Sequence, residues 1–235
     1  MKKVKKDTKK EQGQATQKKQ EGFVVQVFNF FNKHNNTIYG VAIGLLVLVG
    51  ALLAFNRYYI SPQSDKASQL MTAPIGFYMQ GDTLSLNKAL DGDDEHEGFL
   101  TIASSFKLTK TANVANYFAG MCYLKLGEKE DALKYLLKFK QKDDIYWYPT
   151  QALISDIYDD EGDIKKAIKY CKKAAGSKNP YYAPAYLFKL GQLYEREGDF
   201  KNAIAAYETI QNKFYAEYQK MGVDKFLEKA RLNKN

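Results

Sequence analysis

The chain has 235 residues, of which 45% are apolar, 26% charged and 14% aromatic, and its formal net charge is +8. This composition excludes a wholly disordered chain, and five prolines and sixteen glycines are too few for a collagen-like one. Two cysteines exclude a disulfide-rich scaffold and most zinc modules.

The positive charge is concentrated at the start of the chain. Residues 1–37 hold nine lysines and three acidic residues, whereas residues 58–235 hold 25 basic and 24 acidic residues. The bulk of the chain is therefore close to neutral, and we expect no nucleic-acid partner. We expect residues 1–20 to be disordered and to act as a topology signal, in preference to contacting anionic lipid or ribosomal RNA.

The next segment, Gly22–Phe31, places Phe23, Val27, Phe30 and Phe31 at helical spacing. It predicts either a helix in the membrane interface or simply a hydrophobic approach to the segment that follows. Residues 1–37 are thus expected to be a basic disordered tail with a possible interfacial helix.

The run from Ile38 to Phe55 has 18 residues with no charge and no Asn, Gln, Ser or Thr. As a helix it would be about 27 Å long, close to the thickness of the hydrocarbon core. We therefore predict a single transmembrane helix over residues 38–59. A buried helix of a soluble core and a cleaved signal peptide are the alternatives, but the exit, Phe55-Asn56-Arg57, is not a small-x-small cleavage site.

The lysines set the expected orientation of this span. Positive residues beside a first span stay in the cytoplasm, so Lys33 and the upstream lysines predict a cytoplasmic N-terminus. The residues after Arg57 then lie outside the cytoplasm. In a bacterium this is a single-pass inner-membrane protein with a periplasmic C-terminal domain.

Residues 64–80 and 97–107 each show helical periodicity, and we expect a divergent helical pair over residues 60–110. Pro74 marks a kink or an early boundary in the first of them. Between the two lies an acidic cluster at residues 91–97. This cluster does not match a calcium-binding loop, because His96 and Ile102 lie where the loop requires Gly and Glu. We therefore expect a solvated loop.

Three stretches then repeat one pattern, in which a Tyr is followed by a Gly four residues later and by an Ala five residues after that. The spacings between copies are 35 and 36 residues. The Gly suits a left-handed helix end, and the Ala suits the close crossing of two helices. Leu136, Cys171 and Tyr207 are the matching core positions expected further along. The repeated triplets are Tyr123, Gly127 and Ala132; Tyr158, Gly162 and Ala167; and Tyr194, Gly198 and Ala203.

This pattern resembles the tetratricopeptide repeat. The resemblance implies an all-α fold: the single N-terminal transmembrane helix is followed by an α-solenoid of helical hairpins, with three repeats over residues 111–215. We expect residues 216–235 to form a C-terminal capping helix, with Asp224–Leu232 helical and Phe226, Leu227 and Ala230 facing inward.

In such repeats the first helix of each pair lines a groove that binds proteins. By resemblance, this groove would be apolar at one end and acidic in the middle. The groove positions are Tyr117, Met121, Leu124 and Lys125 in copy one; Ala152, Asp156, Asp159 and Asp160 in copy two; and Phe188, Gln192, Glu195 and Arg196 in copy three.

Catalytic chemistry has little support in the sequence. His34 and His96 would lie on opposite sides of the membrane, and no phosphate-binding loop or nucleophile elbow occurs. We expect no enzyme activity, cofactor, metal or small-molecule substrate. Cys122 and Cys171 are expected to be small buried apolar residues rather than a disulfide. For Trp147, packing between repeats is favoured over a ligand contact.

The anchor run at residues 32–59, NKHNNTIYGVAIGLLVLVGALLAFNRYY, and the array behind it resemble the ancillary subunit family of the bacterial Sec translocon. The repeat domain of that family is related to that of the periplasmic cell-division coordinator. The resemblance implies a non-enzymatic adaptor whose partners are the Sec translocon, periplasmic chaperones or secreted chains. A scaffold for envelope or cell-division assembly is the alternative.

Overall fold

The computed structural model describes residues 35–142 and 145–234, and the chain divides into two compact units, Met1–Tyr59 and Ile60–Asn235. The described residues form helices, turns and loops with no strand, and a single isolated bridge joins Gly92 to Glu97. The all-α prediction is therefore confirmed for them. The expected lysine tail and interfacial helix lie outside the described residues.

The first unit contains α2 (Asn35–Phe55), followed by a π-helical turn at Asn56–Ile60. Within Tyr39–Gln80 the described chain has one helix that is long and apolar enough to cross a membrane, by length and composition alone. Large apolar side chains of α2, such as Leu46, Val47 and Leu53, are exposed.

The second unit begins with four short helices rather than the predicted pair over residues 60–110. Pro74 lies in the first turn of α4, where its missing N–H costs nothing, so the chain bends at Met71 and two helices replace one. Asp82 caps α5 by accepting a hydrogen bond from Ser85 N at 3.0 Å. The four helices are α3 (Ser61–Leu70), α4 (Thr72–Gln80), α5 (Thr83–Asp91) and α6 (Phe99–Ser105).

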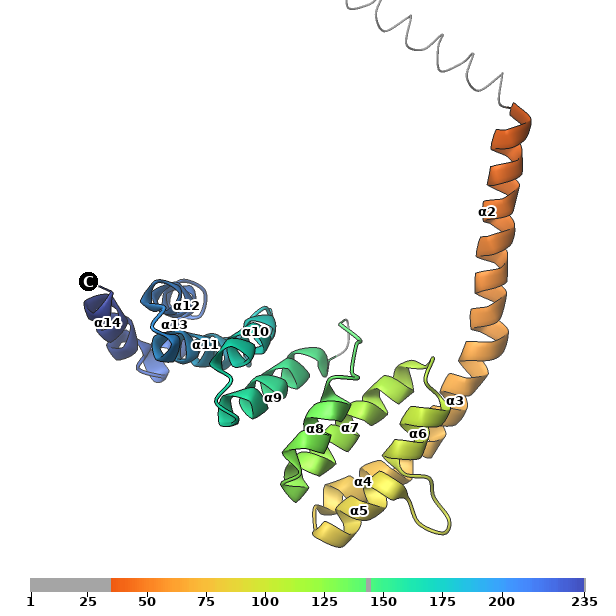
Figure 1. Cartoon of the computed structure of the whole chain (residues 1–235), viewed down its shortest axis with the longest axis horizontal. Helices are drawn as coiled ribbons and strands as arrows, with labels where there is room; N and C mark the ends of the chain where they lie inside the picture. Colours follow the sequence, from red (N-terminus) through yellow and green to blue (C-terminus); the bar gives the residue numbers. More distant parts are fainter. Residues whose placement is uncertain (1–34, 143–144, 235) are drawn as a thin grey trace, which may run out of the picture. The chain divides into compact units, whose positions relative to one another are not determined.

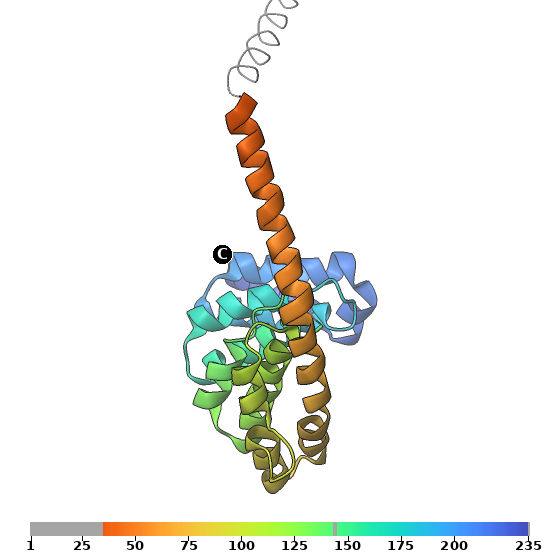
Figure 2. The same cartoon turned by 90° about the vertical axis from the view of Figure 1, so that its right-hand side faces the viewer.

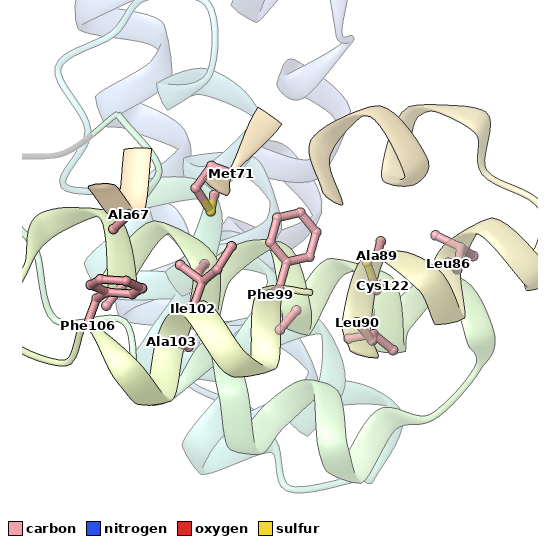
Figure 3. Packing of buried hydrophobic residues seen from close by; sticks show 13 residues of the cluster. Ala67, Met71, Leu86, Ala89, Leu90, Phe99, Ile102, Ala103, Phe106 and Cys122 are labelled. Carbon is pink, nitrogen blue, oxygen red and sulfur yellow. The ribbon is translucent and has the colours of Figure 1, made fainter. Parts of the chain in front are cut away.

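A buried cluster joins these four helices to α7 (Lys110–Leu126). Each element contributes almost completely buried side chains to it (Figure 3): Met71 between α3 and α4, Leu90 of α5, and Phe99 and Ile102 of α6. On the α7 side the fully buried residues are small, and the larger Phe118 stacks on Phe99 with ring centroids 5.4 Å apart. The small residues are Ala112, Ala115, Ala119 and Cys122.

Three helical hairpins follow, as the repeated Tyr–Gly–Ala pattern predicts, and they succeed one another in chain order along the unit (Figures 1 and 2). Each first helix ends before a glycine with a positive φ, 84° at Gly127, 80° at Gly162 and 81° at Gly198. Only glycine adopts this conformation cheaply. The hairpins are α7 with α8 (Lys129–Leu136), α9 (Trp147–Asp160) with α10 (Ile164–Ala174), and α11 (Ala183–Glu197) with α12 (Phe200–Lys213).

In the first and third hairpins a glycine of the first helix faces a large residue of the second. A Cβ on Gly120 would lie 2.6 Å from Leu136 Cγ, and one on Gly191 would lie 2.6 Å from Tyr207 Cζ. In the middle copy the buried Ser155 donates a hydrogen bond to the carbonyl oxygen of Ala167 at 2.9 Å. The predicted core positions Leu136, Cys171 and Tyr207 are all buried, as are Ala132, Ala167 and Ala203.

Two helices follow the last hairpin, α13 (Tyr215–Lys220) and α14 (Val223–Asn233). The sequence predicts a single capping helix over residues 216–235, but Gly222 takes a φ of 63° and divides the segment in two. Leu227 and Ala230 of α14 are buried with Tyr207 and Ile210 of α12. α14 thereby covers the apolar side of the last hairpin.

Candidate protein-binding groove

The twelve groove positions lie on the three first helices, α7, α9 and α11, as the repeat pattern requires. The structure does not bring all of them into one site. The positions of copies two and three face one another, whereas those of copy one are largely engaged elsewhere. The groove consequently has a charged part, between α9 and α11, and an aromatic part near α7.

The charged part is an ion-pair ladder formed by Asp156 and Asp159 of α9 with Lys189 and Arg196 of α11. Lys189 forms an ion pair with Asp156 and lies 4.0 Å from Asp159, and Arg196 donates a hydrogen bond to Asp159. Three of these residues were expected in the groove, and Lys189 was not. Lys189 does not occupy a groove position in the repeat pattern. It follows Asp156 by 33 residues, close to the repeat length, and this spacing could have indicated an ion pair between successive repeats.

Glu195 lies at the C-terminal end of the ladder and is held from two sides. Tyr207 of α12 donates a hydrogen bond to its Oε1 at 2.7 Å, and Lys229 of α14 pairs with its Oε2 at 3.0 Å. Burial raises the pKa of Tyr207, and the nearby carboxylate raises it further, so the phenol remains the donor. Glu195 thus links the last hairpin to α14.

Helix α14 also occupies the apolar groove position of copy three. The rings of Phe188 and Phe226 meet edge to face with centroids 4.8 Å apart. Beside this contact is a hollow of about 640 Å³, bordered by the groove residues Asp159, Gln192, Glu195 and Arg196 and by Phe226 and Lys229. At this end the groove is therefore partly filled by the chain itself.

Other expected groove residues turn away from the ladder. The ammonium of Lys125 lies 4.1 Å from the ring centroid of Tyr78 in α4, a cation–π contact with the N-terminal helices. Asp160 pairs with Lys129 of α8 at 2.7 Å. Leu124 packs against the buried cluster of the second hairpin, and Met121 and Ala152 are half-buried. These residues contribute more to packing between repeats than to an open surface.

The aromatic part of the groove is a second hollow, of about 720 Å³, which we call the tyrosine cleft. Of the expected groove residues only Tyr117 lines it, with its ring stacked on Tyr146 at a centroid distance of 4.5 Å. The sequence pattern did not identify this cleft, because most of its lining comes from the connections between hairpins. The other tyrosines that line it are Tyr148, Tyr182 and Tyr186.

Burial shifts the pKa values of a groove tyrosine and of both cysteines. Burial raises the pKa of Tyr117, and the adjacent tyrosines raise it further, to about 12. Burial likewise raises the pKa of Cys122 and of Cys171 to about 12, so neither thiol is ionised at neutral pH. Both cysteines are buried and free, which confirms their prediction as small apolar core residues. Among the described residues no group of three or more His, Cys, Asp or Glu is placed to hold a metal ion.

Two solved structures are similar to this chain over most of its length. A MamA protein is similar over 71% of this chain and 87% of its own, with 18% identity and a TM-score of 0.48. A Podosopora anserina protein described as a kinesin light chain with nearly identical TPR-like repeats is similar over 72% of this chain and 95% of its own, with 12% identity and a TM-score of 0.46. No curated protein sequence matches the chain.

The family comparison identifies the hairpins themselves. Residues 148–180 and 184–211 match the tetratricopeptide repeat, and residues 117–143 match a second family of the same description. In chain order, the last two matched segments span the hairpins α9–α10 and α11–α12, and the first covers the second half of α7 and all of α8. The three hairpins therefore match the tetratricopeptide repeat.

Proposed function

We propose that this protein is a membrane-anchored, non-enzymatic adaptor that binds other proteins through its tetratricopeptide repeats. The observation that carries the proposal is the presence of three such repeats whose first helices border two open hollows. Repeat arrays of this kind present side chains of successive hairpins along one continuous surface, which suits an extended polypeptide. The groove residues from Tyr117 to Arg196 are proposed as the contact surface.

Anchoring in the membrane is the second part of the proposal. It is supported by the exposed apolar surface of α2 and by the nine lysines among residues 1–37. With the lysines in the cytoplasm, the repeats would face the opposite side of the membrane. In a bacterium the protein would be a single-pass inner-membrane protein with a periplasmic repeat domain.

The likeness of residues 32–59 to the anchor of the Sec ancillary subunit supports a more specific role. In this role the adaptor assists Sec-dependent secretion or periplasmic chaperoning, and its partners are the translocon, chaperones or secreted chains. A scaffold for envelope or cell-division assembly uses the same surface with different partners.

Photo-crosslinking in intact membranes tests the proposal. A crosslinking amino acid placed at Tyr117 or Gln192, which border the two hollows, should give adducts containing Sec subunits or secreted chains, identified by mass spectrometry. Lys201, exposed on the second helix α12, provides a control position that should give few adducts. Adducts with cell-division proteins would instead support the scaffold function. An absence of protein adducts from the groove positions would refute the adaptor function.

A further inference from the structure

The second helix of the middle repeat, α10, exposes only lysine side chains. All other residues of Ile164–Ala174 are buried or half-buried, so the solvent side of this helix is uniformly positive. We call the exposed side chains the lysine face. They are Lys165, Lys166, Lys169, Lys172 and Lys173.

The lysine face is particular to the middle repeat. The equivalent positions of the other two repeats carry mixed or neutral side chains, so the repeat fold does not require lysine there. In the first repeat they are Glu130, Asp131, Lys134, Leu137 and Lys138, and in the third they are Lys201, Asn202, Ala205, Glu208 and Thr209.

Most of this charge works against the stability of its own helix. Lys165 and Lys166 lie in the first turn, at the positive end of the helix dipole, and that turn holds no acidic residue. Lys169 lies four residues after Lys165 and four before Lys173, a spacing at which like charges repel. Burial lowers the pKa of Lys173, and the ammonium of Lys169 lowers it further. A negatively charged partner accounts for this arrangement better than folding does.

Little of the charge is neutralised by the protein itself. Lys166 pairs with Asp163 at 2.8 Å. Over residues 35–142 and 145–234 the other four lysines of the face form no ion pair, in contrast to the cations of the ion-pair ladder. Their charge is therefore available to a partner.

A pair of tyrosines lies among these lysines. The rings of Tyr158 and Tyr170 stack with centroids 5.5 Å apart, and the ammonium groups of Lys169 and Lys173 lie 5.7 and 4.3 Å from the ring centroid of Tyr170. Tyr170 is half-buried, so one edge of its ring reaches the surface. Tyrosine beside lysine is typical of surfaces that meet lipid headgroups.

The lysine face is separate from the groove proposed to bind proteins. No residue of α10 lines either of the two hollows, which are bordered mainly by first helices and by the connections between hairpins. A contact made by the lysine face thus leaves the groove open.

We propose that the lysine face binds the phosphate headgroups of anionic lipids at the surface of the membrane in which α2 is anchored. This inference rests on the proposed anchoring, because a tether holds the repeats close to the headgroups and raises their effective concentration. Lysines are compact charges on flexible stems, which suits a fluid array of phosphates better than the fixed carboxylates of a folded protein. The proposed topology also places the repeats away from nucleic acid.

Photo-crosslinking to lipid tests this inference. The full chain, with a crosslinking amino acid in place of Lys169, is reconstituted in liposomes of phosphatidylglycerol and phosphatidylcholine. We expect adducts with the added mass of one phospholipid, and fewer of them as the salt concentration rises. In liposomes of phosphatidylcholine alone the adducts should be about tenfold fewer. Because a crosslink is local, the lysines of residues 1–37 do not contribute to it.

Matched positions and variants locate the contact. Ala205, exposed at the equivalent position of α12, should give few lipid adducts in either liposome. Lys165→Glu with Lys172→Glu should reduce the adducts from position 169 about tenfold, because two attractive charges become repulsive. Lys201→Glu with Lys213→Glu makes the same change at exposed positions of α12 and should leave the yield within about twofold. Circular dichroism checks that each variant is folded.

Three results would overturn the inference. They are equal adduct yields in the two kinds of liposome, equal yields from positions 169 and 205, and an unchanged yield in the Lys165/Lys172 variant. In intact membranes, protein adducts in place of lipid adducts from position 169 would also overturn it and assign the face to an acidic protein.

A salt wash separates this inference from the anchoring on which it rests. If the chain stays in phosphatidylcholine liposomes at high salt but position 169 gives no lipid adducts in anionic ones, only the role of the lysine face is wrong. If high salt releases the chain from these liposomes, the anchoring itself is wrong.

Discussion

The ring of Tyr207 lies against the α-carbon of Gly191, so close that a methyl group there would be 2.6 Å from the ring carbon Cζ. Ring and glycine belong to the two helices of the third repeat, and the same phenol reaches Glu195 one turn further along α11. This contact fixes both the distance between the helices and the position of a groove carboxylate.

Gly191→Ala should therefore destabilise the protein by about 1–3 kcal/mol, because the fully buried ring of Tyr207 would have to shift to make room for the methyl group. Urea unfolding followed by circular dichroism measures the change. Gly76→Ala is the matched control: it lies within α4, nothing is within 4 Å of the added carbon, and stability should rise by up to about 1 kcal/mol. Equal stability of the two variants would contradict the close approach.

The three hairpins differ in how their second helix is capped. Asp163 and Asp199 accept hydrogen bonds from Lys166 N and Asn202 N at 3.0 and 3.1 Å, whereas Glu128 at the matching position makes no such bond. Asp163→Ala should cost about 1 kcal/mol, and Glu128→Asp should stabilise the first repeat by roughly half as much. Thermal unfolding of both variants checks this, and a loss of stability in Glu128→Asp would show that the first turn of α8 cannot use a shorter acid.

Alkaline pH should destabilise the fold through its buried thiols. The pKa of Cys122 and of Cys171 is about 12 in the folded chain, compared with an ordinary value of 9.0. The unfolded chain releases these protons first, so the free energy of unfolding falls as pH rises from about 9 to 12 and is unaffected by them below that range. Urea midpoints across this interval, compared with those of a Cys122→Ala/Cys171→Ala variant, should show a smaller alkaline loss in the variant.

The same thiols should react slowly with a thiolate-selective reagent in the native protein at pH 8. In guanidinium chloride both should react quickly, because burial no longer opposes ionisation. Fast labelling of the native chain would mean that at least one cysteine is accessible.

Phe226→Ala should loosen α14 without unfolding the repeats. The variant loses the edge-to-face contact with Phe188 and part of an apolar cluster, which corresponds to about 1–2 kcal/mol. Hydrogen exchange should accelerate in Val223–Asn233 and remain unchanged in α7. Leu232→Ala, at an exposed position of the same helix, should have little effect; equal acceleration in both variants would argue against a specific role for Phe226.

The repeats could be predicted from the sequence because their determinants are local and periodic. Gly127, Gly162 and Gly198 follow the first helices because the chain takes a positive φ there, which glycine adopts at little cost. These glycines recur at nearly constant spacing. The N-terminal helices were harder to predict from the sequence, because nine-residue helices such as α5 have too few turns to show a clear periodicity. Their boundaries depend on single residues, Pro74 in α4 and Asp82 before α5.

The candidate site was only partly predictable for a related reason. Groove positions such as Asp159 and Arg196 follow from repeat register and do meet in space. Tyr146 and Tyr182 belong to the connections between hairpins, where the repeat pattern assigns no positions. That both line one cleft depends on how successive hairpins stack. The register also gives no indication that α14 covers Phe188.

The position of α14 also determines where the array can be lengthened. It packs on α12 much as α11, the first helix of the third repeat, packs on α10. The place that a fourth repeat would use is thus already taken by Val223–Asn233. An engineered extra hairpin at this end would therefore have to displace α14 from α12, and would lose the contacts of Leu227 and Ala230 with Tyr207 and Ile210.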